Sequence, residues 1–218
     1  MSSEPGSLLE LALDPGIEPP DDAISERILD AALALSAASG LRNLTMDDVA
    51  RRARVGRMTV YRRFGDKARL VESLAVRESR RCLAALDAAA PPAAPIEDQI
   101  AEGFVTSLRI AREHPLLNRL ARLEPESVLE AFVADQSAIF AAARGFLAAR
   151  LRAAQEAGVL GPVSVDEAAE LLVRLALSFV LIQETVLPLD DEERVRDVAR
   201  RLIAPVLTSR GPLARRLD

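Results

Sequence analysis

The chain has 218 residues, of which 50% are apolar and only 3% aromatic, and its formal net charge is −5. This length supports one or two domains with a substantial hydrophobic core. A single histidine and a single cysteine exclude a histidine-based metal cluster, a zinc thiolate site and an intramolecular disulfide. Alanine and leucine dominate the apolar residues, and no segment of any length alternates apolar and polar side chains, so we predict an all-α fold.

The first 40 residues divide into a tail and a helix. Residues 1–21 are rich in proline and glycine, and we expect a disordered tail whose short apolar piece is neither a signal peptide nor a membrane span. Asp21 and Asp22 then cap a helix that ends at Gly40. Its apolar face is formed by Ile24, Ile28, Ala31, Ala32 and Leu35.

Two short helical patterns, separated by a turn, occupy residues 41–67. Thr45 followed by Asp48 is a capping-box pattern that starts the first helix. In the second helix, Val60 and Phe64 are four residues apart and share one face. Met58 and Arg62 point to the opposite side, with Thr59 and Tyr61 beside them, and this outward face carries hydrogen-bonding groups. A helix with this layout, packed on a partner helix, is suited to the DNA major groove.

Charge is distributed unevenly along the chain. Residues 41–81 contain twelve Arg or Lys and five Asp or Glu, whereas the remaining residues contain sixteen basic and twenty-eight acidic side chains. A run of charge is usually only a solvated face. Here the basic segment coincides with the groove-binding pattern, so we expect it to direct polyanions to one end of the molecule.

Residues 41–67 resemble the DNA-binding domain of the tetracycline-repressor (TetR) family. The matching residues are Thr45, Val49, Ala50, Ala53, residues 59–64, Asp66, Lys67 and Leu70. The order Tyr61, Phe64, Lys67 is the family's most recognisable signature. Arg54 and Gly56 depart from the family, which usually has glycine and then, two residues on, serine or threonine. In a left-handed conformation Arg54 would cost roughly 1 kcal/mol relative to glycine.

Together the pattern and the resemblance predict the residues that contact double-stranded DNA. Arg62 is the candidate for reading a guanine edge. Phosphate contacts are expected from Thr45, Tyr61 and Lys67. The full predicted set is Thr45, Arg57, Met58, Thr59, Tyr61, Arg62, Arg63 and Lys67.

We predict a helix-turn-helix DNA-binding domain at 22–65, a connecting helix at 66–90, a ligand-binding and dimerisation domain at 96–208, and a tail at 209–218. In the second domain, a bend is expected between Leu129 and Asp135. Apolar side chains there could line a cavity for a small, uncharged or weakly polar effector of unknown identity. The candidate ligand-binding residues are Phe104, Leu108, His114, Leu117, Phe140, Phe146, Arg174 and Phe179. His114 could instead cap a helix, and Arg174 could pair with a glutamate across a dimer.

Two apolar helices at the C-terminus resemble the family's dimer interface. Residues 168–182 are apolar almost all round but too few to span a bilayer. We expect this helix to end at Pro188, and the last helix to carry a stripe of Val195, Val198, Leu202 and Val206. A homodimer would cover both helices, and a monomer that buries them internally is the alternative.

The sequence therefore predicts a cytoplasmic DNA-binding transcriptional regulator with no cofactor, no metal and no membrane contact. Family habit favours a repressor that a small effector releases from a palindromic operator. No Gly-rich phosphate loop or nucleophile elbow points to an enzyme. Two alternatives remain, a helical enzyme that uses scattered carboxylates and a helical ligand-binding or scaffold protein without specific DNA binding.

Overall fold

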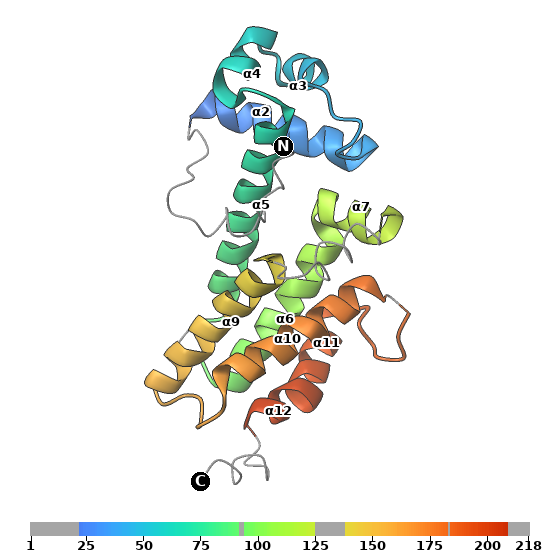
Figure 1. The fold of residues 1–218 in the computed structure, drawn as a ribbon. Coiled ribbons are helices and arrows are strands. Elements are labelled where there is room, and N and C mark those ends of the chain that lie inside the picture. Colours follow the sequence, from blue (N-terminus) through green and yellow to red (C-terminus); the bar gives the residue numbers. More distant parts are fainter. Residues whose placement is uncertain (1–21, 92–93, 125–137, 183, 209–218) are drawn as a thin grey trace. The chain divides into compact units, whose positions relative to one another are not determined.

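The computed structural model describes residues 22–91, 94–124, 138–182 and 184–208. Its regular structure within these ranges is entirely helical, which confirms the all-α prediction (Figure 1). The predicted tails, Asp21 and the bend between Leu129 and Asp135 lie outside the described residues. The helices are α2 (Ala23–Ser39), α3 (Met46–Ala53), α4 (Arg57–Phe64), α5 (Lys67–Ala89), α6 (Ile96–Glu113), α7 (Pro115–Leu123), α9 (Ala138–Glu156), α10 (Val165–Leu181), α11 (Glu192–Val198), the π-helix η1 (Ala199–Ile203) and α12 (Ala204–Thr208).

The described residues form two compact units. One contains the residues up to Cys82 and those from Arg112 to Ile139, and the other contains Leu83–Ala111 and the residues from Phe140 onward. Helices α5 and α6 each begin in one unit and end in the other. This division groups α7 with the N-terminal helices, whereas the sequence pattern predicts residues 115–123 in the second domain.

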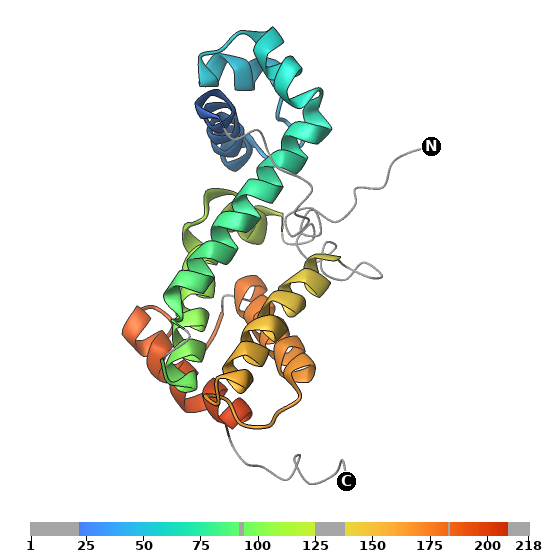
Figure 2. The same cartoon turned by 90° about the vertical axis from the view of Figure 1, so that its left-hand side faces the viewer.

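In the N-terminal unit, α2, α3 and α4 pack around the start of α5 (Figure 2). Asp22 caps α2 by accepting from the backbone N–H groups of Ile24 and Ser25, and Gly40 ends the helix with a φ of 86°, both as predicted. Helix α7 lies beside α2, where the Arg119 guanidinium donates to the carbonyl of Ala38 at 3.2 Å. The core consists of Ile28, Leu29, Leu44, Val49, Val60, Phe64, Leu70 and Leu74 with smaller neighbours.

A buried group of charges joins α2, α5 and α7 in the same unit. Arg77 is 6% exposed and contacts three carboxylates, those of Glu26 at 3.0 Å, Asp30 at 2.9 Å and Glu78 at 2.8 Å. Burial alone would raise the pKa of Glu78, but the hydrogen bond from His114 and the charge of Arg77 outweigh it and lower the pKa. The ionised carboxylate is therefore part of the folded structure.

The second unit has its own core, formed by α6, α9, α10 and the C-terminal helices. Val195 and Val198 are buried as predicted, but Leu202 and Val206 are exposed and Ile203 and Leu207 are buried in their place. The extra residue in the π-helical turn η1 rotates the following helix, so the buried stripe moves by one position.

Helix α10 ends at Leu181, so the prediction that it continues to Pro188 is wrong. The Thr185 hydroxyl accepts the N–H of Leu187 at 3.0 Å, a local turn that competes with helical hydrogen bonds. None of the described helices combines the length and apolar character needed to cross a membrane.

Candidate nucleic-acid interface

Helix α3 begins at Thr45, whose hydroxyl oxygen accepts the backbone N–H of Asp48 at 3.1 Å. The same hydroxyl donates to the Asp48 carboxylate at 2.6 Å. Met46, Val49, Ala50 and Ala53 are buried against the core, which holds the start of α3 at a defined position. Thr45 itself remains exposed, as a residue that contacts a phosphate must be.

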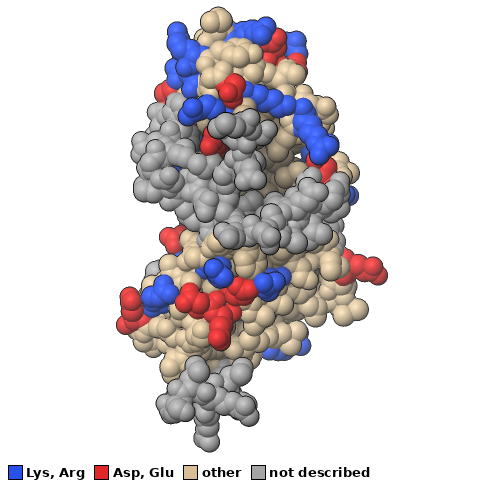
Figure 3. Space-filling model, viewed as in Figure 1, with Lys and Arg blue, Asp and Glu red and all other residues tan. Residues whose placement is uncertain are grey.

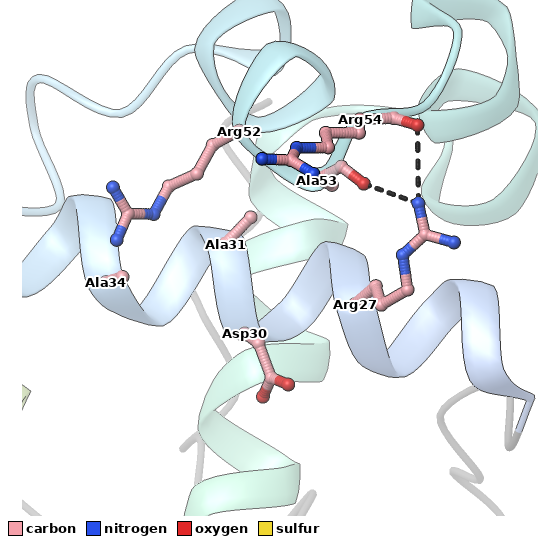
Figure 4. Close-up of a pocket in the computed structure, with 7 residues that line it drawn as sticks. All are labelled: Arg27, Asp30, Ala31, Ala34, Arg52, Ala53 and Arg54. Carbon is pink, nitrogen blue, oxygen red and sulfur yellow. Dashed lines mark hydrogen bonds between the residues drawn. The ribbon is translucent and has the colours of Figure 1, made fainter.

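The turn into α4 passes through a strained residue. Arg54 has φ 54° and ψ 47°, the left-handed conformation that its place in the turn suggests. The Arg27 guanidinium donates to the carbonyls of Ala53 at 2.7 Å and Arg54 at 3.3 Å (Figure 4). Arg27, whose role the sequence pattern does not indicate, therefore satisfies free carbonyls at the end of α3 and fixes the turn.

An open hollow of about 460 Å³ lies between α2 and the end of α3. Among the described residues, the guanidiniums of Arg52 and Arg54 have no partner. Asp30, the acidic residue of the lining, is paired with Arg77 at 2.9 Å. The lining residues are Arg27, Asp30, Ala31, Ala34, Arg52, Ala53 and Arg54 (Figure 4). The hollow adds positive charge to this domain, and the predicted ligand-binding residues do not take part in it.

Helix α4 presents two contrasting faces, as the spacing predicted. Val60 and Phe64 are buried, whereas Met58 is 77% exposed and Arg62 is also exposed. Thr59 and Tyr61 are half-buried. Figure 3 shows Lys and Arg side chains gathered over the helix-turn-helix on the face in view. Core packing therefore fixes the back of α4 and leaves its front open to a polyanion.

Arg57, the first residue of α4, is held from two sides. Its Nε lies 2.9 Å from Oδ1 of Asp47 in α3, and its Nη1 donates to Oδ2 of the same carboxylate at 3.1 Å. The guanidinium also lies over the ring of Tyr61, 5.3 Å from the centroid, and donates to its hydroxyl at 3.4 Å. The bond to Tyr61 and the charge of Asp47 raise the pKa of Arg57, and the same contacts orient its guanidinium.

Two further residues of the predicted contact set, Arg63 and Lys67, also have partners in the protein. The Arg63 guanidinium bonds to the Asp22 carboxylate and to the Ser25 hydroxyl, which ties α4 to the start of α2. Arg63 therefore points to the protein side of α4, and we leave it out of the proposed contact set. The Lys67 amine donates to the carbonyl of Arg42 at 2.7 Å and keeps its other N–H groups for a phosphate.

These features coincide with a known family. Residues 28–74, which run from α2 to α5, match the family model described as "Bacterial regulatory proteins, tetR family". Residues 28–74 therefore form a TetR-family helix-turn-helix domain, of the kind that transcriptional regulators use to bind DNA.

Relatives of this protein match it over most of their length. An uncharacterised HTH-type transcriptional regulator of Mycobacterium tuberculosis is 24% identical over 192 residues, 88% of this chain and 89% of that protein. The fatty acid degradation regulator FadR of Bacillus halodurans has a TM-score of 0.59 and 17% identity, covering 82% of this chain and 95% of its own. The TetR-family repressor AlkX of Dietzia, implicated in biodegradation of n-alkanes, has a TM-score of 0.53 and 23% identity. The match covers 86% of this chain and 96% of the AlkX chain. At these identities the two structures establish likeness of fold alone.

The predicted ligand-binding residues lie in both units. His114 and Leu117 belong to the N-terminal unit, and the other six belong to the second unit. His114 caps α7, since its Nδ1 accepts the N–H of Leu117 at 3.3 Å, and its Nε2 lies 3.0 Å from the Glu78 carboxylate. The alternative that His114 caps a helix is therefore confirmed.

In the second unit, the aromatic candidates are in contact with neighbours. Phe104 is buried and packs edge to face on Phe179, with 5.4 Å between ring centroids. Arg174 lies over the ring of Phe140 at 5.0 Å and pairs with Glu170 one turn earlier in α10 at 2.6 Å. Arg174 thus has a glutamate partner in its own helix. Leu108 is buried and Phe146 is half-buried.

Proposed function

We propose that this protein binds a palindromic operator as a homodimer, represses transcription there, and is released by a small apolar effector. The observation that carries the proposal is the exposed front of α4. Val60 and Phe64 anchor the helix, while Met58 and Arg62 make no contact with the described residues that would withdraw them from DNA. A rigid helix with an open, polar and basic front is what major-groove recognition requires.

Each residue of the proposed contact set has a role that follows from its chemistry. Arg62 matches the two acceptors of a guanine edge, and the apolar Met58 matches the methyl group of thymine. Thr59 supplies a hydroxyl for either base edges or the backbone. Thr45, Tyr61 and Lys67 would bind phosphates and so set the register of the domain on the duplex.

The homodimer is supported by apolar surface on the C-terminal helices. Leu171 in α10 is 41% exposed, and Leu202 and Val206 at and after the π turn are 49% and 54% exposed. A second copy would bury these side chains across a two-fold axis. The two recognition helices would then be about 34–36 Å apart, or a multiple of this, so the operator would be a palindrome.

The effector proposal rests on the aromatic and aliphatic side chains around Phe104 and Phe179 in the second unit. Two structural relatives are named for fatty acid degradation and for biodegradation of n-alkanes, and we propose an effector of similarly apolar chemistry here. Helix α5 carries residues of both units and is a covalent route by which an effector could alter DNA binding. A coupling of 1–3 kcal/mol would change DNA affinity by about 5–150-fold.

Selection of bound sequences from a random DNA pool tests the proposal. We expect a palindromic operator, and we expect Arg62→Ala to lose about 1–3 kcal/mol with relaxed preference at one position of each half-site. Arg122→Ala, which removes an exposed arginine of α7, is the matched control and should leave operator affinity unchanged. Equal affinity of Arg62→Ala and the parent at matched salt would contradict the assignment.

The release step needs a second experiment. Lipophilic compounds that raise the melting temperature would be titrated into the preformed protein–operator complex. Release of DNA by such a compound, with an equal weakening of the compound by operator DNA, is the expected reciprocal result. A tightly bound compound without coupling in either direction would refute the effector part of the proposal.

A further inference from the structure

One carboxylate lies among the cations of the DNA-binding face. Asp47 is in the first turn of α3, and its side chain is 55% exposed. Its two oxygens contact Arg57 at 2.9 and 3.1 Å, and Arg57 in turn lies over Tyr61 of α4. Because Arg57 and Tyr61 both belong to the predicted DNA-contact set, Asp47 is placed beside the front of the recognition helix.

Stabilisation of its own helix does not account for this placement. An acidic residue in the first turn stabilises a helix through its dipole. Asp48, the next residue, already has this role, since it bonds to Thr45 and to Arg51 within its own helix. Asp47 instead turns towards α4. On a surface that approaches phosphates, a carboxylate is repelled unless it meets a hydrogen-bond donor on a base edge.

We propose that Asp47 is a specificity-determining residue that accepts a hydrogen bond from the N4 amino group of a cytosine in each operator half-site. The inference rests on the proposed operator binding and specifies one of its positions. Carboxylates pair with cytosine because its major-groove edge presents the N4 amino donor, whereas guanine presents only acceptors there. Adenine also has a donor, but its neighbouring N7 acceptor would face the second carboxylate oxygen.

Arg57 is the positioning residue for this contact. Its Nε, Nη1 and Nη2 are each directed to Asp47 or Tyr61, which leaves few donors for a phosphate. It therefore orients the carboxylate and offsets the negative charge of Asp47 near DNA. Loss of Asp47 would free Arg57 to bind a phosphate, so one substitution should affect specific and non-specific binding in opposite directions.

The experiment compares Asp47→Ala with Asp48→Ala, which makes the same change of charge at the next position. Affinities would be measured by fluorescence anisotropy over a range of salt, on the selected operator and on a scrambled duplex. For Asp47→Ala we expect about a 5–150-fold loss of preference for cytosine at one position per half-site, the equivalent of 1–3 kcal/mol. We also expect tighter binding to the scrambled duplex, with a salt slope steeper by about one phosphate contact.

Further variants sharpen the test. Asp48→Ala should keep the cytosine preference even if its weaker helix cap lowers the melting temperature. The nearly isosteric Asp47→Asn preserves the shape of the side chain, and its added amide donor should shift preference from cytosine towards adenine. Changing the cytosine in the operator should cost the parent affinity but leave Asp47→Ala unaffected, a cycle that cancels any general loss of stability.

Two results would overturn the proposal. In the first, Asp47→Ala raises the affinity for operator and scrambled DNA equally, so that Asp47 only adjusts net charge. In the second, it lowers both equally with the cytosine preference intact, so that Asp47 only supports the fold. Failure of the parent to select any sequence would instead refute the proposed operator binding, and the two failures are thus distinguishable.

Discussion

Removal of Arg77 should destabilise the protein far more than removal of Arg81, although the two arginines share carboxylate partners. Arg77 is 6% exposed and lies within 3.0 Å of Glu26, whereas Arg81 is 51% exposed and lies 2.7 Å from the same carboxylate. Both also contact Glu78, whose side chain is 10% exposed. The pair therefore isolates the effect of burial from that of charge.

The expected magnitude follows from what each substitution to methionine leaves behind. Breaking a buried ion pair by removing one partner costs about 3–5 kcal/mol, because a buried charge is left uncompensated. After Arg77→Met, the half-buried Glu26 and the exposed Asp30 can be hydrated, and Glu78 keeps His114 and Arg81 as partners. We therefore expect a loss near 3 kcal/mol, the lower end of that range. Arg81→Met removes an exposed arginine and leaves Glu78 paired with Arg77, so it should cost less than about 1 kcal/mol.

Urea unfolding followed by circular dichroism at pH 7 would measure both losses. The melting temperature of the Arg77 variant should fall by about 6–12 °C, because each kcal/mol corresponds to roughly 2–4 °C for a chain of this size. Without Arg77, burial would raise the pKa of Glu78 above its present lowered value. The lowered pKa of Glu78 in the parent contributes stability that is lost as the pH falls and the carboxyl is protonated, so the difference between parent and variant should shrink in acid.

Equal losses of stability for the two variants would refute this reasoning, because burial would then make no difference. The double variant Arg77→Met with Glu78→Gln supplies a second check. It removes the uncompensated charge together with its partner and should recover part of the loss. A double variant as unstable as the sum of its single changes would show that the buried carboxylate is not the cause.

Three further predictions concern single positions. Arg54→Gly should raise the free energy of unfolding by up to about 1 kcal/mol, because it relieves the left-handed strain. The control Arg52→Gly, within α3, should lower the free energy of unfolding by about 1 kcal/mol. Changes of the same sign for both variants in denaturant titrations would contradict the strain argument. Burial and the nearby Glu78 carboxylate raise the pKa of the Cys82 thiol to about 11, so labelling by a thiol reagent at pH 7.5 should be much slower than for an exposed cysteine, and a fast reaction would refute this. Leu202→Glu should convert the proposed homodimer to monomer or insoluble protein in sedimentation experiments, with sedimentation of the parent as a monomer at micromolar concentration as the contrary outcome.

Local chemistry explains how much of the DNA-binding domain could be predicted from the sequence. Thr45 caps α3, Gly40 ends α2, and the spacing of Val60 and Phe64 defines the buried side of α4, because each of these depends on neighbours within one or two turns. The family signature in residues 59–67 extends the same local pattern. For this reason the exposed front of the recognition helix, with Met58 and Arg62, follows from residue spacing alone.

The contacts between residues distant in sequence were decided by the tertiary structure alone. Arg63 turns to Asp22, forty-one positions away, and Arg57 turns to Asp47 in another helix, so neither partner can be inferred from helical spacing. The π turn at residues 199–203 moves the buried stripe from Leu202 to Ile203, because one inserted residue rotates every side chain that follows. Side-chain pairing across helices and the rotation of one helix against another depend on three-dimensional packing, and a linear pattern of apolar and polar residues contains neither.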